Sequence, residues 1–383
     1  MSRDGKGSKP GLIRIISLPN ASQGEEQSIG IRASESDQKV LDSFFESPLL
    51  NVVGVDSKDG WWFLSRLNHE GYASAPFLDH RSFVFSEDEH AAFKAAPSLI
   101  RERYHAVGSP RRSFSTIFHV GHCGSTLLAN LLGERSDTHV LREPPAFRWL
   151  ANHQSEFERR GELGGWVDMV GGVVSRTFSP QHDPVVKASS WCHPLMEAVL
   201  ELDGDNRCVF LYTGLREFLV RFLGKRRGDM EKSALKSFDT FSGELPLELR
   251  EWERMEGWQR GTLAWLSKIW SCDRAKNTKD GDRVLPLSFG QLLKAPEQSL
   301  ALVSSFLQLR EADAPDEALA SWATYAKDRQ RGFSIEDEHQ RLRNGEREHS
   351  QEIEQGLELS LSLIRKGLVS QDWTAHCDEA SWD

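Results

Sequence analysis

The residue types most suited to chemistry gather in one short segment, Gly121-His122-Cys123-Gly124-Ser125-Thr126. A short apolar run precedes it, and leucines at helical spacing follow at once. Two glycines allow the backbone to turn tightly and to aim successive N–H groups into a concavity. A helix N-terminus adds unpaired donors and partial positive charge, and the two hydroxyls add further donors. The segment predicts a cradle for a phosphate-like anion; an ordinary strand-to-helix turn capped by Ser or Thr is the alternative.

The loop departs from the Walker pattern of nucleotide hydrolases. That pattern, G-x-x-x-x-G-K-[ST], needs a lysine to bridge the outer phosphates. Here Gly124 is followed directly by Ser125, and no lysine lies in the loop. Ordinary ATP or GTP hydrolysis is therefore disfavoured.

The elements that would position this loop alternate along the chain. Short apolar runs rich in β-branched residues are followed by longer stretches with helical periodicity, which describes βαβ units. The pattern predicts an α/β protein with a three-layer, mainly parallel sheet flanked by helices. The strand-like runs are FSTIFHV, THVLRE, PVVKAS, RCVFLYT and DRVLPLSF.

Composition changes divide the chain into three parts. Residues 1–38, rich in Gly, Ser, Asp and Glu, are expected to form a mobile leader. Residues 39–112 contain short β-like pieces and end in a Gly-Ser-Pro linker, which predicts a small accessory region. Residues 113–383 hold the alternating pattern and a C-terminal helical tail.

Charge and cysteine content narrow the classes of protein. The 383 residues include 47 basic and 57 acidic side chains, a formal charge of −10, which argues against a nucleic-acid binder. No apolar run approaches the roughly 18 residues of a membrane span, and the N-terminus lacks secretory-signal features. Five cysteines without a C-x-x-C pair indicate reduced thiols and a cytoplasmic location. His119, His122 and Cys123 would alternate between faces of a strand, so no metal site is expected.

A loop with hydroxyls but no lysine, followed by Thr-Leu-Leu, resembles the 5′-phosphosulfate loop of sulfotransferases. Segments in the matching order agree with the same resemblance over roughly 114–309, about half the chain: Val140–Pro144, Val185–Lys187, Cys208–Thr213 and Leu285–Leu293. This resemblance implies a P-loop-like sulfotransferase fold and 3′-phosphoadenosine 5′-phosphosulfate (PAPS) as co-substrate, with no metal.

The resemblance also implies roles for individual residues. Glu143 corresponds to a catalytic glutamate after the second strand, and Lys187 to a lysine that faces the donor. With His122, these are the expected catalytic residues. Sulfuryl transfer resembles in-line phosphoryl transfer, so a carboxylate within reach of the acceptor hydroxyl would take its proton. The residues expected to bind the donor are Gly121, His122, Cys123, Gly124, Ser125, Thr126, Arg216 and Arg221.

Two positions depart from the family pattern. His122 stands where the family usually has Lys or Arg, and Thr213 and Arg221 stand where it has an arginine and a serine that read the 3′-phosphate. Three functions therefore stay open. The first is transfer of a sulfuryl group from PAPS to a hydroxyl or amine. The others are an ATP-using phosphotransferase and a non-catalytic binding module that retains the fold. The sequence does not identify the acceptor.

Overall fold

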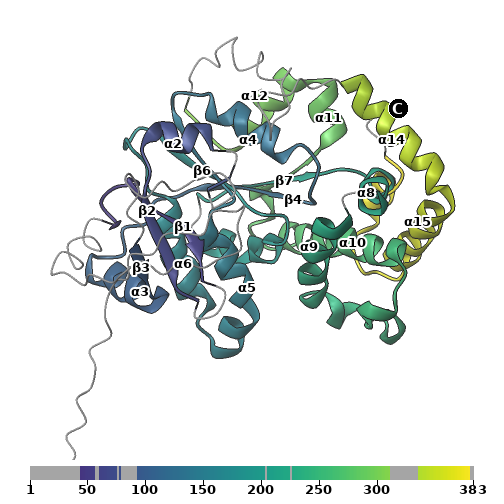
Figure 1. Cartoon of the computed structure of the whole chain (residues 1–383), viewed down its shortest axis with the longest axis horizontal. Coiled ribbons are helices and arrows are strands. Elements are labelled where there is room, and N and C mark those ends of the chain that lie inside the picture. Colours follow the sequence, from purple (N-terminus) through teal and green to yellow (C-terminus); the bar gives the residue numbers. More distant parts are fainter. Residues whose placement is uncertain are drawn as a thin grey trace, which may run out of the picture.

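A computed structural model describes residues 44–56, 60–75, 77–78, 93–202, 205–224, 227–310 and 335–379. The leader expected over 1–38 lies outside these residues. Figure 1 shows the arrangement of the described elements, with β1 to β3 and α3 at one end of the molecule and α14 and α15 at the other.

The centre of the molecule is a five-stranded parallel sheet of order β5-β6-β4-β7-β8. Its strands are short and largely buried, as expected for a sheet covered on both faces. They are β4 (Ser115–His119), β5 (Thr138–Arg142), β6 (Asp183–Lys187), β7 (Cys208–Tyr212) and β8 (Val284–Ser288). The prediction of an α/β protein with a mainly parallel sheet is confirmed.

Helices cover both faces of this sheet. The chain moves in opposite directions across the sheet before and after β5, and right-handed crossovers then place the connecting helices on opposite faces. In Figure 1, α4 and α12 lie over one face, and α6 and α10 over the other. The helices that follow the central strands are α4 (Ser125–Gly133), α5 (Pro145–Arg160), α6 (Leu163–Val174), α7 (Met196–Leu202), α8 (Leu215–Leu223), α9 (Arg227–Asp239), α10 (Gly257–Lys276), α11 (Phe289–Lys294) and α12 (Pro296–Phe306). A 3-10 turn, η1 (His193–Leu195), leads into α7.

A smaller antiparallel sheet precedes the central one. It consists of β1 (Leu50–Val55), β2 (Trp62–Arg66) and β3 (Phe93–Ala95), with α2 (His69–Ser74) and α3 (Pro97–Ala106) beside it. This layer packs on α5, where the rings of Trp62 and Trp149 meet edge to face with centroids 5.3 Å apart. The amide of Leu78 donates to the carbonyl of Arg142, the last residue of β5. The layer therefore reaches the edge of the sheet where the strands end.

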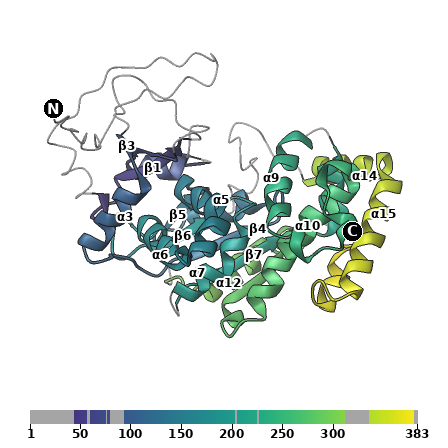
Figure 2. The ribbon, with the colours of Figure 1, turned by 90° about the horizontal axis from the view of Figure 1, so that it is seen from below.

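The C-terminal part adds α14 (Ile335–Glu348) and α15 (Ser350–Arg365), which pack against α8 and α10. Both views place these helices at the end of the molecule opposite β3 and α3 (Figure 2). Within the described residues, no helix is both long and apolar enough to cross a lipid bilayer.

Candidate active site at the ends of β4, β5 and β6

The loop between β4 and α4 is built from backbone conformations that aim amides to one side. Gly121, His122 and Gly124 all have positive φ angles, of 97°, 53° and 74°. Left-handed residues beside right-handed ones turn successive N–H groups toward a shared concavity. His122 adopts this conformation without being glycine, which costs roughly 1–2 kcal/mol. These left-handed conformations are compatible with the predicted anion cradle, which stays a prediction.

Buried side chains fix the loop from below. The Nε2–H of His119 donates to the carbonyl of Ala188 at 2.9 Å, which leaves Nδ1 to accept from the amide of Gly121 at 3.1 Å. The thiol of Cys123 is fully buried and donates to the carbonyl of Leu211. Burial raises the pKa of this thiol to about 11, so it is protonated near neutral pH. Cys123 therefore supports the loop from inside and does not act as a thiolate.

Phe289, the first residue of α11, closes the other side of Gly124. A Cβ added at Gly124 would lie 2.2 Å from the ring of Phe289. The φ of 74° and this close approach both require glycine at the position. The amides of Ser125, Thr126 and Leu127 follow directly and precede the first helical hydrogen bond, from the amide of Leu128 to the carbonyl of Gly124 at 3.0 Å. These three amides, with the partial positive charge of the helix end, are donors that an anion could use.

A carboxylate, an ammonium and a hydroxyl meet beside this loop. Arg142 and Lys187 pair in register at the ends of β5 and β6, so Glu143 emerges next to Lys187. The ammonium of Lys187 donates to Oε1 of Glu143, and the hydroxyl of Ser189 donates to Oε2 at 3.2 Å. The side chain of Lys187 is 2% exposed and that of Glu143 is 11% exposed. The carboxylate is therefore the part of this ion pair that solvent or a ligand can reach.

The backbone of Glu143 is strained. Its φ is +55°, although Pro144 follows it and the residue before a proline favours extended conformations. Its amide is held by the carbonyl of Lys187 at 2.7 Å. Strain in a non-glycine residue persists only where the surroundings fix it, and it clusters at functional positions. In this conformation the Glu143 carboxylate accepts from Lys187.

The loop and the ion pair lie within electrostatic reach of each other. The charges of Arg221 and Lys187 both lower the pKa of the Cys123 thiol, against the larger effect of burial. On the other side, Ser190 lies against the loop, since a Cβ at Gly121 would meet its Cβ at 3.4 Å. The hydroxyl of Ser190 also contacts that of Ser233 in α9. Glu143, Lys187 and the loop thus form one site at the carboxyl edge of the sheet, where ligands of open α/β sheets bind.

The two arginines expected to bind the donor have other partners. Arg216 makes ion pairs with Glu346, Glu354 and Asp378. Arg221 lies between Glu217 and Glu338, and these carboxylates raise its pKa against the opposing effect of burial. An anionic ligand would have to displace these carboxylates to bind either guanidinium. Both arginines therefore hold α14, α15 and the C-terminal residues against α8.

Thr213 lies at the end of β7, on the same edge of the sheet. Its side chain is buried, and its Oγ1 has no hydrogen-bond partner among the described residues. A buried hydroxyl without a partner is a candidate donor to a ligand.

The described residues contain no group of three or more His, Cys, Asp or Glu side chains arranged to hold a metal ion.

Sequence reasoning identified Glu143, Lys187 and the loop but gave no role to three residues that complete the site. His119 was considered only as a metal ligand, yet it holds the first loop amide. Ser189, which the sequence analysis does not name, donates to Glu143. Phe289 carried no signal, because its contact with Gly124 joins residues 165 positions apart and depends on the sheet order.

Comparison with known proteins gives resemblances in structure alone. No family model matches the chain, and no curated protein matches it significantly in sequence. Among solved structures, the chain is similar to a sulfotransferase domain from the curacin biosynthetic pathway, with a TM-score of 0.37 and 13% identity over 53% of this chain and 77% of that one. The sulfotransferase domain of the Synechococcus PCC 7002 olefin synthase gives a TM-score of 0.36 and 14% identity, over 58% of this chain and 82% of that one. A Mycobacterium avium sulfotransferase gives a TM-score of 0.37 and 10% identity, over 66% of this chain and 79% of that one.

Proposed function

We propose that the chain transfers a sulfuryl group from PAPS to a hydroxyl or amine acceptor. The observation that carries this proposal is the meeting of Glu143, Lys187 and Ser189 beside a loop of left-handed residues that opens into the N-terminus of α4. The loop offers amides for an anion, but it contains no lysine that could bind the outer phosphates of a triphosphate. A carboxylate, an ammonium and an anion cradle are the groups that sulfuryl transfer needs.

The residues present fit the 5′-phosphosulfate end of the donor. The amides of Ser125, Thr126 and Leu127 precede the first helical bond, and the hydroxyls of Ser125 and Thr126 make no hydrogen bond within the described residues. When bound, the donor supplies an activated sulfuryl group on a phosphate that can leave. At the other end, the unpartnered Oγ1 of Thr213 is the available group for the 3′-phosphate. The proposal does not use Arg216 and Arg221, since both are paired with carboxylates.

Glu143 is proposed as the general base. The acceptor O–H or N–H loses a proton as it attacks, and a carboxylate within hydrogen-bond reach accepts it. Lys187 and Ser189 donate to the two carboxylate oxygens, which orients the group. The Glu143 side chain is 11% exposed, so an acceptor can approach its carboxylate from solvent.

Lys187 and the loop amides are proposed to stabilise the charge that develops on the departing phosphate. Fixed donors aimed at a developing charge need no rearrangement during the reaction, which makes them effective. Lys187 is held by Glu143 and lies 5.7 Å from the ring centre of Phe77, which excludes water from its ammonium. His122, whose backbone is strained in the loop, is proposed to add a further donor.

Thermal shift with three ligands tests the proposal against its alternatives. A ligand at 100 times its dissociation constant stabilises a protein by about 2.7 kcal/mol. Adenosine 3′,5′-bisphosphate is expected to raise the melting temperature, whereas ATP with Mg²⁺ is not. Stabilisation by ATP-Mg²⁺ alone would instead indicate a phosphotransferase. Stabilisation by neither would indicate a non-catalytic binding module, for which the neutralised arginines are the supporting observation.

The proposed acceptor carries a hydroxyl or amine. A cytoplasmic location is part of the same proposal: the five cysteines are all buried free thiols, which suits a reducing compartment.

A further inference from the structure

A second candidate binding site lies away from the loop. It is a pocket of about 310 Å³ between α5, α7, α10 and the end of α9. The pocket contains none of the residues assigned to sulfuryl transfer. Gln154 lies nine residues beyond the start of α5, so it stands about 14 Å along the helix from Pro145, next to the site of Glu143. The two sites are therefore separate, and the following inference does not depend on the proposed function.

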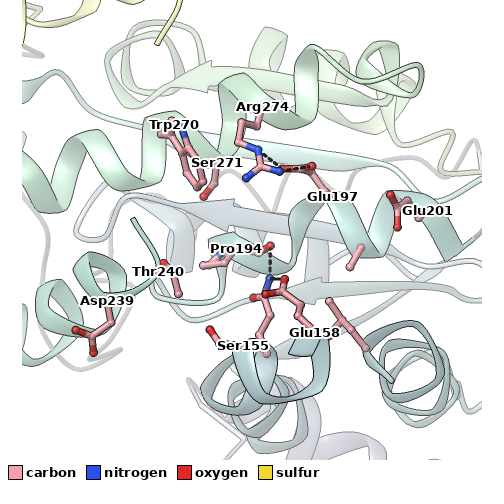
Figure 3. Close-up of a pocket in the computed structure, with 13 residues that line it drawn as sticks. Ser155, Glu158, Pro194, Glu197, Glu201, Asp239, Thr240, Trp270, Ser271 and Arg274 are labelled. Carbon is pink, nitrogen blue, oxygen red and sulfur yellow. Dashed lines mark hydrogen bonds and ion pairs between the residues drawn. The ribbon is translucent and has the colours of Figure 1, made fainter. Parts of the chain in front are cut away.

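The pocket is strongly acidic. Figure 3 shows side chains of α10 on one side and of α5 on the other, with Asp239 and Glu201 at opposite ends of the view. Four carboxylates and one arginine line it, a formal charge of −3. Arg274 is paired with Glu197 at 3.0 Å, whereas Glu158, Glu201 and Asp239 have no ion-pair partner among the described residues. Burial, with the nearby charge of Glu253, raises the pKa of Asp239.

Gln154 provides an independent sign of a missing ligand. Gln154 is only 8% exposed to solvent, and it lines the pocket. Its Nε2 donates to Oε1 of Glu158 at 2.8 Å and to the carbonyl of Pro194 at 3.2 Å. Both partners are acceptors, so the amide cannot be turned over without placing two acceptors against each other. Its Oε1 is consequently left without a partner among the described residues, and a buried acceptor in that state calls for a donor.

The arrangement of these groups favours an extended cation. The carboxylates are spread along the pocket, and no three of the described acidic, His or Cys side chains come together as a metal site. A ligand with several separated ammonium groups would pair with the three unpaired carboxylates, and an N–H of the same ligand would satisfy Oε1 of Gln154. We propose that this pocket binds a small linear aliphatic polyamine.

Isothermal titration calorimetry with spermidine, at constant ionic strength, tests this proposal. Saturable binding is expected, at least about tenfold tighter than that of butylamine, since each extra ammonium adds an ion pair. The double variant Glu201→Gln/Asp239→Asn is expected to weaken spermidine binding about tenfold. Gln154→Met removes the unpartnered oxygen and is expected to weaken it as well. Glu248→Gln, at an exposed acid outside the pocket, serves as the matched control and should bind as the wild type does.

Three results would overturn the proposal. One is a wild-type titration without saturation. Another is displacement of spermidine by Mg²⁺ at equal ionic strength, which would indicate general counter-ion attraction. The third is unchanged binding in the double variant. Melting curves of each variant without ligand show whether it is folded, and all the substituted acids are exposed enough that folding should be retained.

Discussion

Two groups of paired charges lie at the carboxyl edge of the same sheet, and they differ in what their cations are paired with. At the ends of β5 and β6, one ammonium faces one carboxylate, and a hydroxyl completes the group. At α8, Arg216 and Arg221 face five carboxylates between them, most of them from residues 338–378. The first group stands beside the loop that we propose binds an anion. The second joins the C-terminal helices to α8.

The difference shows how a basic run in a sequence is to be interpreted. The Arg and Lys residues of 216–227 stand where the sulfotransferase resemblance expects a phosphate contact, and their number alone favours that reading. In the folded chain, carboxylates more than a hundred residues later satisfy the two arginines. Lys187, a lone cation at a strand end, instead contacts Glu143, and we propose that it takes part in the reaction. Pairing in three dimensions, not local charge density, separates the two cases.

The largest expected effect is a loss of sulfuryl-transfer rate when the carboxylate of the first group is removed. Glu143→Gln should lower the rate of sulfuryl transfer by about 10²–10⁴-fold, because the amide cannot accept the acceptor's proton. Binding of adenosine 3′,5′-bisphosphate should change little. Steady-state rates and calorimetry on the same preparations measure both quantities. Glu338→Gln, an acid of the second group, is the matched control and should keep its rate; a full rate in Glu143→Gln would remove that residue from the mechanism.

The next effect concerns stability. Lys187→Met leaves the Glu143 carboxylate buried without its cation, and breaking a buried pair in this way costs about 3–5 kcal/mol. The double variant Glu143→Gln/Lys187→Met removes both charges and should recover part of this loss. Urea unfolding of the wild type and the variants gives the coupling free energy. Additive losses in the double variant would show that the two side chains do not stabilise each other.

Gly124→Ala tests the cradle itself. An alanine there meets the Phe289 ring and adopts a φ of +74°, so we expect a loss of about 2–4 kcal/mol in unfolding free energy and weaker donor binding. Gly161→Ala is the matched control, because Gly161 has a φ of +68° but no atom within 4 Å of its Cβ position. Equal losses in the two variants would mean that Phe289 moves away freely.

Lys268 extends the comparison to a cation without a carboxylate. It is buried in α10, and its ammonium donates to the carbonyl of Ala264, with no ion-pair partner among the described residues. Burial lowers its pKa to about 7. The unfolded chain binds this proton up to a pKa near 10.5, so the lysine makes stability rise with pH above 7, by at most about 1.4 kcal/mol per pH unit.

The effect of pH on Lys268 is measured as the difference in unfolding free energy between the wild type and a variant without this lysine. Subtracting the unfolding free energy of Lys268→Met from that of the wild type, at pH 7 to 8.5, isolates the lysine from the buried thiols. The difference should move in favour of the wild type as pH rises. A flat difference would mean that the lysine has its ordinary pKa in the folded state.

The smallest effect is expected at Glu338. Glu338→Gln removes one of the two carboxylates on Arg221, while Glu217 remains, so unfolding free energy should fall by about 1 kcal/mol or less. Affinity for adenosine 3′,5′-bisphosphate should stay the same within about twofold, which calorimetry measures. A clear gain in affinity would show that Arg221 competes for the donor, and the second group would then belong to the active site.

Sequence reasoning was sufficient for the sheet and for the loop, because both depend on local signals. Alternating apolar runs mark the strands, and Gly121 and Gly124 mark the turn. It could not supply the closing contacts. The ring of Phe289 reaches Gly124 only through the β7–β8 pairing, and the carboxylates on Arg216 come from helices far along the chain. The strain at Glu143 was also hidden, since a residue before proline is expected to be extended.

Amide hydrogen exchange tests the central claim most directly, because the account assigns the anion to backbone N–H groups. Adding adenosine 3′,5′-bisphosphate should slow exchange in the peptide that spans 120–128, including the amides of Ser125, Thr126 and Leu127. The peptide of α14 should exchange as before. Unchanged exchange in 120–128 together with protection in 335–348 would contradict the account, since the anion would then bind at the arginines of α8.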